Sequence, residues 1–333
     1  MEAAASPTPL PSSRSLSRKL TFGLVAGTFV YGALLLYGDA RALLEGMRRV
    51  PPHYLVIATT LSLGNFALRF VRWTSYLRAL DIDVPRRDSV LVFLSGFAMT
   101  ITPGKIGEIL KPLMLHEAHG VPIARSTPIV VAERLTDLVG LVLLAGIGAT
   151  ALRGGLVFAV LAFSGVIVLG LLATRPQLAA WAIDRITRVR RLAPLRQKLL
   201  DASAALSALM RPRTFLTSCA LSVVAWGLQG LALYVVALGF AGVTLSVLQA
   251  LAVYSTPLLA GALAMIPGGL GLTEASMTGA LQQLGGEGAT RAAAAGITIL
   301  VRLVTLWIAI AIGFAALSWW NVRAVKERRT VAR

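Results

Sequence analysis

Residues 102–108 read TPGKIGE and residues 266–274 read IPGGLGLTE, so one short pattern occurs twice in the chain. Each copy follows an apolar run, breaks at Pro-Gly and ends on a carboxylate. An arginine within a long apolar segment follows each copy, Arg134 after the first and Arg302 after the second. Paired interruptions at corresponding positions of two halves are typical of transporters with a site near the membrane midplane. The pattern therefore predicts two related halves, each containing a broken helix.

The composition indicates a membrane protein. Of the 333 residues, 56% are hydrophobic and 14% are charged, and the mean hydropathy is +0.75. Soluble domains carry about 25% charged residues. Long apolar runs with few charges indicate transmembrane helices. The expected fold class is all-α, a polytopic membrane helix bundle.

The charge is strongly positive, with 32 Lys and Arg against 15 Asp and Glu. In a soluble protein this balance would suggest a nucleic-acid partner. Here the basic residues lie in loops, so the positive-inside rule and anionic lipid at the cytoplasmic face explain them better. We expect no nucleic-acid partner. The single cysteine, Cys219, lies in an apolar stretch and is expected to be a small core residue.

The topology follows from the order of apolar and basic segments. Apolar segments occupy roughly residues 20–37, 54–77, 89–102, 127–152, 155–174, 214–238, 247–266 and 292–320. Basic residues concentrate in the N-terminal tail, in the linker 175–213 and at the C-terminus, so these three should be cytoplasmic. If every apolar segment crossed the membrane, the linker would lie outside. The number of crossings places all three basic segments on the cytoplasmic side if residues 89–118 and 247–285 each enter and leave the membrane by the same face.

The sequence thus predicts about six full spans and two re-entrant helical hairpins, arranged as an inverted repeat. Irregular backbone at membrane depth must be buried or line a wet cavity, so the two hairpins should enclose such a cavity. Both termini should be cytoplasmic, in the cell inner membrane. The expected divisions are a disordered tail (1–19), a transmembrane domain (20–320) with repeats at about 54–152 and 214–320 joined by the basic linker 175–213, and a basic tail (321–333).

Several charged residues lie inside apolar segments. Glu133, Arg134 and Asp137 form one group, in which Arg134 and Asp137 can pair at a spacing of three. Arg302 lies roughly 15 Å along its helix from Arg291, near the midplane. Its candidate partners are Glu274 and, across the repeat, Glu108. Charges at such depth are costly and usually mark a functional site; a structural lock within the bundle is the alternative.

A third group lies in the second span. Asn65, Arg69 and Arg72 follow one another at helical spacing, with Trp73 adjacent. One interpretation places them in the binding site, and the other makes them snorkelling arginines beside an interfacial tryptophan. Lys105 and Lys111 flank the first break and could hold a lipid phosphate as point charges.

The candidate substrate-binding residues therefore share two properties: they lie at a break or carry charge within an apolar segment. They are Arg69, Arg72, Pro103, Gly104, Lys105, Gly107, Glu108, Lys111, Glu133, Arg134, Asp137, Pro267, Gly268, Gly269, Gly271, Glu274 and Arg302.

No catalytic residue, metal ligand or cofactor is predicted. His116 and His119 are three residues apart, unlike the zinc motif with histidines four apart, and there is no P-loop, dinucleotide fingerprint or nucleophile elbow. Residues 176–211 interleave basic and apolar side chains, which suits either amphipathic helices on the inner leaflet or a solvated linker.

These motifs together resemble a known family. The run Glu133-Arg134-Leu135-Thr136-Asp137, the two Pro-Gly breaks and the Asn65 to Trp73 group are similar to the lysylphosphatidylglycerol synthase transmembrane-region family, also called flippase-like domain proteins. The resemblance covers roughly residues 20–320. In the name-giving members this region translocates aminoacylated phosphatidylglycerol and precedes a soluble synthase domain. We expect no such domain here, because the sequence stops at Arg333.

The resemblance implies a stand-alone member that translocates lipid in a bacterial inner membrane. Stand-alone members are thought to move other lipids, so the expected partner is a phospholipid, glycolipid, polyprenyl or hopanoid-type lipid. Two alternatives stay open: a membrane enzyme acting on a lipid-linked substrate, and a non-catalytic accessory subunit of a separate lipid-modifying enzyme. The first lacks a recognisable nucleophile–base pair. A homo-oligomer is also left open.

Overall fold

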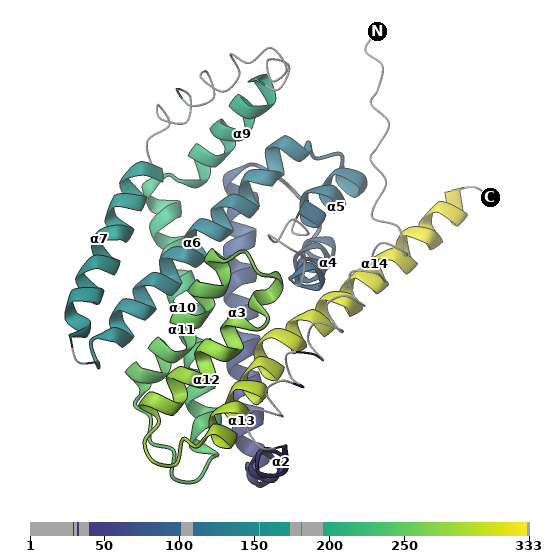
Figure 1. Cartoon of the computed structure of the whole chain (residues 1–333). Helices are drawn as coiled ribbons and strands as arrows, with labels where there is room; N and C mark the ends of the chain where they lie inside the picture. Colours follow the sequence, from purple (N-terminus) through teal and green to yellow (C-terminus); the bar gives the residue numbers. More distant parts are fainter. Residues whose placement is uncertain are drawn as a thin grey trace.

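The computed structural model describes residues 29, 32, 40–100, 109–152, 154–173, 181 and 196–331. Within these ranges the regular elements are helices and there is no strand, as the composition predicts (Figure 1). The predicted tail 1–19, nearly all of the first span and about half of the linker lie outside the described residues.

The first half of the described chain consists of long helices separated by shorter ones (Figure 1). Its elements are α2 (Ala40–Arg49), α3 (Pro52–Ala79), α4 (Arg86–Ser95), the 3₁₀ helix η1 (Gly96–Met99), α5 (Leu110–His119), α6 (Ile123–Ala149) and α7 (Gly155–Ala173).

The second half also combines long helices with shorter ones. Its elements are α9 (Arg196–Leu209), α10 (Pro212–Leu238), α11 (Val247–Leu263), the 3₁₀ turn η4 (Pro267–Gly269), α12 (Leu272–Leu284), α13 (Arg291–Arg302), the π-helical segment η5 (Leu303–Trp307) and α14 (Ile308–Val331). The second Pro-Gly break thus separates two helices, as predicted.

Local sequence explains where these helices begin and end. Proline occupies the first position of both α3 and α10, where its missing N–H is not needed. Ser246 caps α11 through a reciprocal capping box with Gln249. Gly120 ends α5 with a positive φ of 66°, a conformation that glycine adopts without steric cost.

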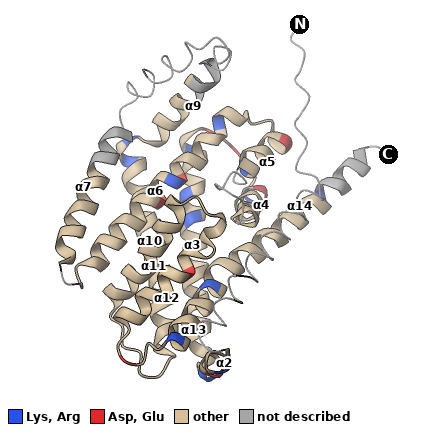
Figure 2. Cartoon of the chain, viewed as in Figure 1, with Lys and Arg blue, Asp and Glu red and all other residues tan. Residues whose placement is uncertain are grey.

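Three helices among the described residues are long and apolar enough to cross a membrane: α3, α10 and the continuous helix Arg291–Arg323. α6 is as long as α10, but its apolar stretch is interrupted by charged residues. Figure 2 shows these charges between α3 and α6, within the bundle. α11 is apolar but has only 17 residues. The structure therefore supports a polytopic membrane protein.

The two halves pack together reciprocally. The first long helices, α3 and α10, lie against each other. α6 packs against α11 of the other half, and α14 packs against α4 and η1. Glycine permits both of these last contacts: a Cβ atom at Gly148 would lie 2.5 Å from the nitrogen of Ala252, and one at Gly313 would lie 2.2 Å from the nitrogen of Ala98. A long helix of each half therefore packs against shorter helices of the other half: α6 against α11, and α14 against α4 and η1.

α7 lies at the edge of the bundle and packs against α6 (Figure 1). Much of its surface is apolar and exposed, including Leu156, Phe158 and Leu161. An exposed apolar face of this extent is expected where lipid covers the protein. Cys219 of α10 is buried, as predicted for a small core residue.

The orientation can be tested with two introduced cysteines in a Cys219→Ser background. Ala204 in α9 and Ala241 after α10 are both exposed. The positive-inside rule predicts that α9 is cytoplasmic, and α10 is long enough to place Ala241 on the opposite face. An impermeant maleimide should label Ala241→Cys in intact cells, and Ala204→Cys only after permeabilisation. The unlabelled parent is the control, and the reverse pattern would contradict the predicted topology.

Candidate functional site

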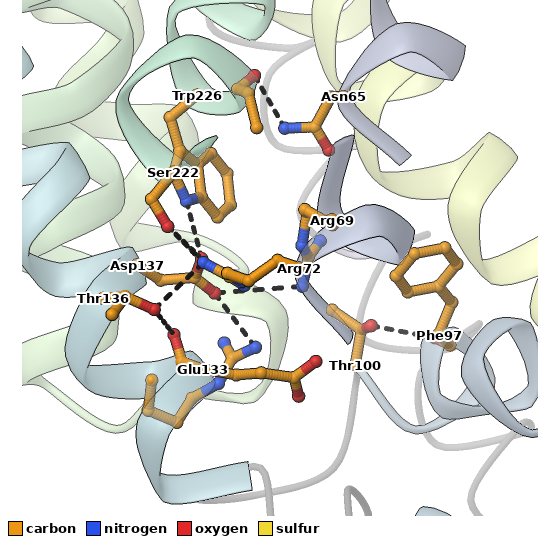
Figure 3. Close-up of polar contacts among 12 residues, drawn as sticks. Asn65, Arg69, Arg72, Phe97, Thr100, Glu133, Thr136, Asp137, Ser222 and Trp226 are labelled. Atoms are coloured by element: carbon orange, nitrogen blue, oxygen red, sulfur yellow. Dashed lines mark hydrogen bonds and ion pairs between the residues drawn. The ribbon is translucent and has the colours of Figure 1, made fainter. Parts of the chain in front are cut away.

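The first charged cluster is built around Asp137 of α6. Arg72 of α3 donates from Nη1 to Asp137 Oδ1 at 2.7 Å, and Trp226 of α10 donates from Nε1 to the same oxygen at 3.0 Å. Ser222 Oγ lies 3.4 Å from this oxygen and also bonds to Arg72. Figure 3 shows Asp137 between these side chains. Three helices therefore meet at one carboxylate oxygen.

The other oxygen of Asp137 faces two further arginines. Arg134 Nη2 lies 3.1 Å from Oδ2, so the predicted pairing at a spacing of three is confirmed. Arg69 Nη2 lies 3.8 Å from the same atom. The Arg69 guanidinium also contacts two rings, 5.2 Å from the centroid of Phe97 and 5.5 Å from that of Trp226. Cation–π contacts of this length hold a guanidinium in place.

The interfacial interpretation of Arg72 is wrong. Its side chain is completely buried, with 0% exposed, and it hydrogen-bonds to Thr136 as well as to Asp137. A snorkelling arginine would extend along the surface toward water. Arg72 turns inward instead because α6 presents a carboxylate at the same level. Its neighbour Trp73 is also buried and donates to Ser89 of α4 at 3.1 Å.

Lys111 of α5 lies inside the bundle. Its ammonium pairs with Glu133 of α6 and lies 4.7 Å from the ring centroid of Trp73. Both partners of this ion pair are buried. The sequence placed Lys111 beside the first break as a contact for a lipid phosphate, and the structure gives it a protein carboxylate as partner.

The second charged cluster joins Arg302 to the second break. Arg302 Nε donates to Glu274 Oε1 at 2.6 Å, so the predicted Arg302–Glu274 pair is confirmed. Arg302 Nη2 donates to the carbonyl of Gly268 at 2.6 Å. The other oxygen of Glu274 accepts from the Gly271 amide at 2.7 Å, which caps α12. Gly268 and Gly271 have φ values of 60° and 89°, so the break needs glycine at both positions.

The helix that carries Arg302 is irregular directly after it. Residues Leu303–Trp307 form a π-helical segment, and Thr305 within it donates to the carbonyl of Val301 at 2.7 Å. Short π-helical insertions are often found at functional sites, because they change the direction of the side chains that follow. Arg302 and Thr305 both line the cavity described next.

One cavity lies between the two clusters. Its volume is about 430 Å³, and it is lined by α3, α6, α10, α11, the second break and the α13–α14 helix. Its charged lining comes from both clusters: Arg69, Arg134, Asp137 and Arg302. Its other polar lining residues are Asn65, Thr100, Gln229, Tyr254, Thr273 and Thr305. The two charged clusters therefore share one space.

The cavity reaches the surface at the end of α11. Ala262, Leu263 and Met265 line it and are exposed; Leu263 and Met265 have 74% and 66% of their surface accessible. An apolar, exposed rim beside a charged interior suits a molecule with an apolar part and a polar part. Lipids have this division.

The two clusters together are positively charged. The described residues that form them include the cations Arg69, Arg72, Lys111, Arg134 and Arg302 and the carboxylates Glu133, Asp137 and Glu274, which gives a formal sum of +2. The cavity therefore favours an anionic group. Among the described residues, no group of three His, Cys, Asp or Glu side chains could hold a metal ion.

The structure brings together most of the predicted site residues that it describes. Pro103, Gly104, Lys105, Gly107 and Glu108 lie outside the described residues.

Sequence reasoning missed three polar residues of α10. Ser222, Trp226 and Gln229 recur at spacings of four and three on one face of an otherwise apolar helix. That stripe was a usable signal, because polar side chains in a transmembrane helix usually face the bundle interior.

Comparison with known proteins agrees with this architecture. The chain matches the family described as "Lysylphosphatidylglycerol synthase TM region" over residues 22–313 and belongs to it, which confirms the resemblance seen in the sequence. It is similar to a UPF0104 membrane protein of Pyrococcus horikoshii, with 23% identity over 318 residues, 87% of this chain and 94% of the relative. A UPF0104 membrane protein of Methanothermobacter thermautotrophicus is 24% identical over 323 residues, 90% of this chain and 94% of the relative.

Proposed function

We propose that the protein translocates a lipid across the cell inner membrane, with the head group in the cavity and the acyl chains in the bilayer. The observation that carries this proposal is the cavity that is lined by residues of both charged clusters and reaches the surface at the apolar rim of α11. A polar head group crosses hydrocarbon slowly because its desolvation is costly. A cavity with fixed charges replaces part of the lost hydration.

An inverted repeat with two re-entrant hairpins belongs to the same proposal. α11 is about 25 Å long, shorter than the roughly 30 Å hydrocarbon core, and packs against α12 after the break. The reciprocal contacts of α6 with α11 and of α14 with α4 support two halves of opposite orientation. In this arrangement, the broken backbone lines the cavity, where irregular structure is tolerated at membrane depth.

Blocking the rim should stop translocation. Ala262 lines the cavity and is exposed, so Ala262→Trp adds a large ring to the rim without displacing buried core. We expect the rate of dithionite-accessible loss of fluorescent lipid in proteoliposomes to fall at least about tenfold, the loss of roughly 1.4 kcal/mol of transition-state stabilisation.

Thr256→Trp is the matched control, because Thr256 is exposed on the same helix and does not line the cavity. It should translocate lipid like the wild type. Equal rates for both variants would contradict the assignment of the cavity. Conversion of the lipid to a new product in the same vesicles would instead favour an enzyme, and neither movement nor product would favour an accessory subunit.

A further inference from the structure

We propose that Arg69 and Arg134 form the binding site for the phosphate of an anionic phospholipid, which binds beside Oδ2 of Asp137. This inference deepens the proposed function and rests on it for the role in translocation. The binding step itself can be measured separately. The two oxygens of Asp137 have unequal surroundings.

Oδ1 of Asp137 is fully engaged by the protein. It accepts hydrogen bonds from Arg72 Nη1 and Trp226 Nε1, and Ser222 Oγ lies 3.4 Å away. Oδ2 lies near Arg134 and Arg69 but, within the described part of the chain, accepts no hydrogen bond of good geometry. Oδ2 is therefore held by charge alone, so an oxyanion bound beside it can accept hydrogen bonds from the two arginines while Oδ1 keeps its own partners.

The two arginines that face Oδ2 both line the cavity. Their guanidinium groups approach one point from different helices, Arg69 from α3 and Arg134 from α6. A phosphate has several oxygens and can accept paired N–H hydrogen bonds from more than one guanidinium group. One carboxylate oxygen cannot accept the paired hydrogen bonds of two guanidinium groups. The two guanidinium groups thus have hydrogen-bonding capacity for a phosphate beside the carboxylate.

Arg69 is positioned independently of Asp137. Its contacts with Phe97 and Trp226 place the guanidinium between two rings, as Figure 3 shows. Its Nε atom is buried and has no hydrogen-bond partner among the described residues. A donor that is already oriented loses little conformational freedom when a ligand binds. The aromatic contacts therefore prepare Arg69 for an anion.

The charges also favour an anionic ligand. Arg69, Arg72 and Arg134 surround the single carboxylate of Asp137, which gives this group a formal charge of +2. A phosphodiester lowers that charge, while Asp137 keeps Arg72 through Oδ1. A head group with an added cation, such as choline, gains less because its positive charge enters the same cavity.

Asn65 indicates what else the head group carries. It lies one helical turn from Arg69, lines the cavity and is only 1% exposed. Its Nδ2 donates to the carbonyl of Ala225 at 2.7 Å, and its Oδ1 has no partner among the described residues. A buried acceptor without a donor is unfavourable. A head-group hydroxyl could supply the donor, so the favoured class is a phosphodiester bearing hydroxyl groups, as in phosphatidylglycerol.

Native mass spectrometry of the full-length purified chain tests the site. The protein in neutral detergent is titrated with phosphatidylglycerol, phosphatidylcholine or a phosphate-free glucosyl diacylglycerol of the same acyl chains. We expect the wild type to retain phosphatidylglycerol most strongly. Arg69→Gln and Arg134→Gln should each weaken its retention about tenfold, because each removes one charged fork. Arg78→Gln, an exposed change on the same helix as Arg69, should bind like the wild type.

Glycerol 3-phosphate, added as a soluble competitor, separates the two possible sources of phosphate. Displacement of phosphatidylglycerol only at large excess supports a lipid ligand, and equal potency of the soluble phosphate overturns it. Equal retention of phosphatidylglycerol by the wild type and both arginine variants, each eluting as a single species, also overturns the site, as does equal retention of the glycolipid. Failure of translocation with intact, arginine-dependent binding would reject the proposed function but not this site.

Discussion

Replacing Arg302 by alanine should prevent accumulation of folded protein. Glu274 is completely buried, with 0% exposed, and its Oε1 accepts from Arg302. Alanine would leave that carboxylate without its cation and the carbonyl of Gly268 without the Arg302 donor. Breaking a buried ion pair on one side costs about 3–5 kcal/mol. Whole domains are commonly stable by only about 5–15 kcal/mol, so the loss is a large fraction of the total.

Fluorescence-detected size exclusion with a thermal ramp measures the effect, as folded yield and as the temperature of half loss. Arg291→Ala, at the exposed start of the same helix, is the control and should behave like the wild type. The double variant Arg302→Ala with Glu274→Gln should recover yield, because no buried charge remains unpaired, but not translocation. Wild-type behaviour of Arg302→Ala would show that the pair contributes little to folding.

Asp137→Ala should have an effect of similar size. It removes the carboxylate that faces Arg69, Arg72 and Arg134, and Arg72 has no exposed surface through which to gain water. The remaining like charges repel one another at low effective dielectric, and Trp226 loses its acceptor. We expect a loss of about 3–5 kcal/mol, by the reasoning for a broken buried pair.

The measurement is again folded yield and thermal midpoint, with Glu45→Ala as the control because Glu45 forms an exposed pair on α2. Exposed pairs contribute about 0–1 kcal/mol, so this variant should be unchanged. Adding Arg72→Met to Asp137→Ala should recover part of the yield by removing the most buried cation. If the single Asp137 variant folds normally, then water must reach the cluster.

Much of the fold could be predicted because its signals are local. Apolar runs predicted α3, α6, α7 and α10 to within a few residues, and Pro267 predicted where α11 gives way to α12. The start of α6 was placed at Thr127, whereas the helix begins at Ile123 because Pro122 is its N-cap residue. The π-helical segment after Arg302 has no sequence signal of its own, since it arises from packing.

The site was predictable only where partners share a helix or lie at a recognised break. Arg134 and Asp137 are three apart, and Arg302 could be matched to the carboxylate that follows the break. Arg72 and Asp137, in contrast, are 65 residues apart, and the pair depends on how α3 packs against α6. No single-helix pattern carries that information. The burial of Arg72 therefore became apparent only from the tertiary structure.

The close approach at Gly148 has a mechanical consequence. Gly148 lies on the helix that carries Asp137, and it touches the backbone of α11 with no side chain between them. α11 leads to the break whose Gly268 carbonyl is bound by Arg302. Because backbone atoms are in contact here, a change of side-chain rotamer cannot let one helix slide past the other. We therefore expect α6 and α11 to move as one rigid body. Any motion that opens the cavity must then carry Asp137 and the break together, so it must take place where this body meets α3 and the α13–α14 helix.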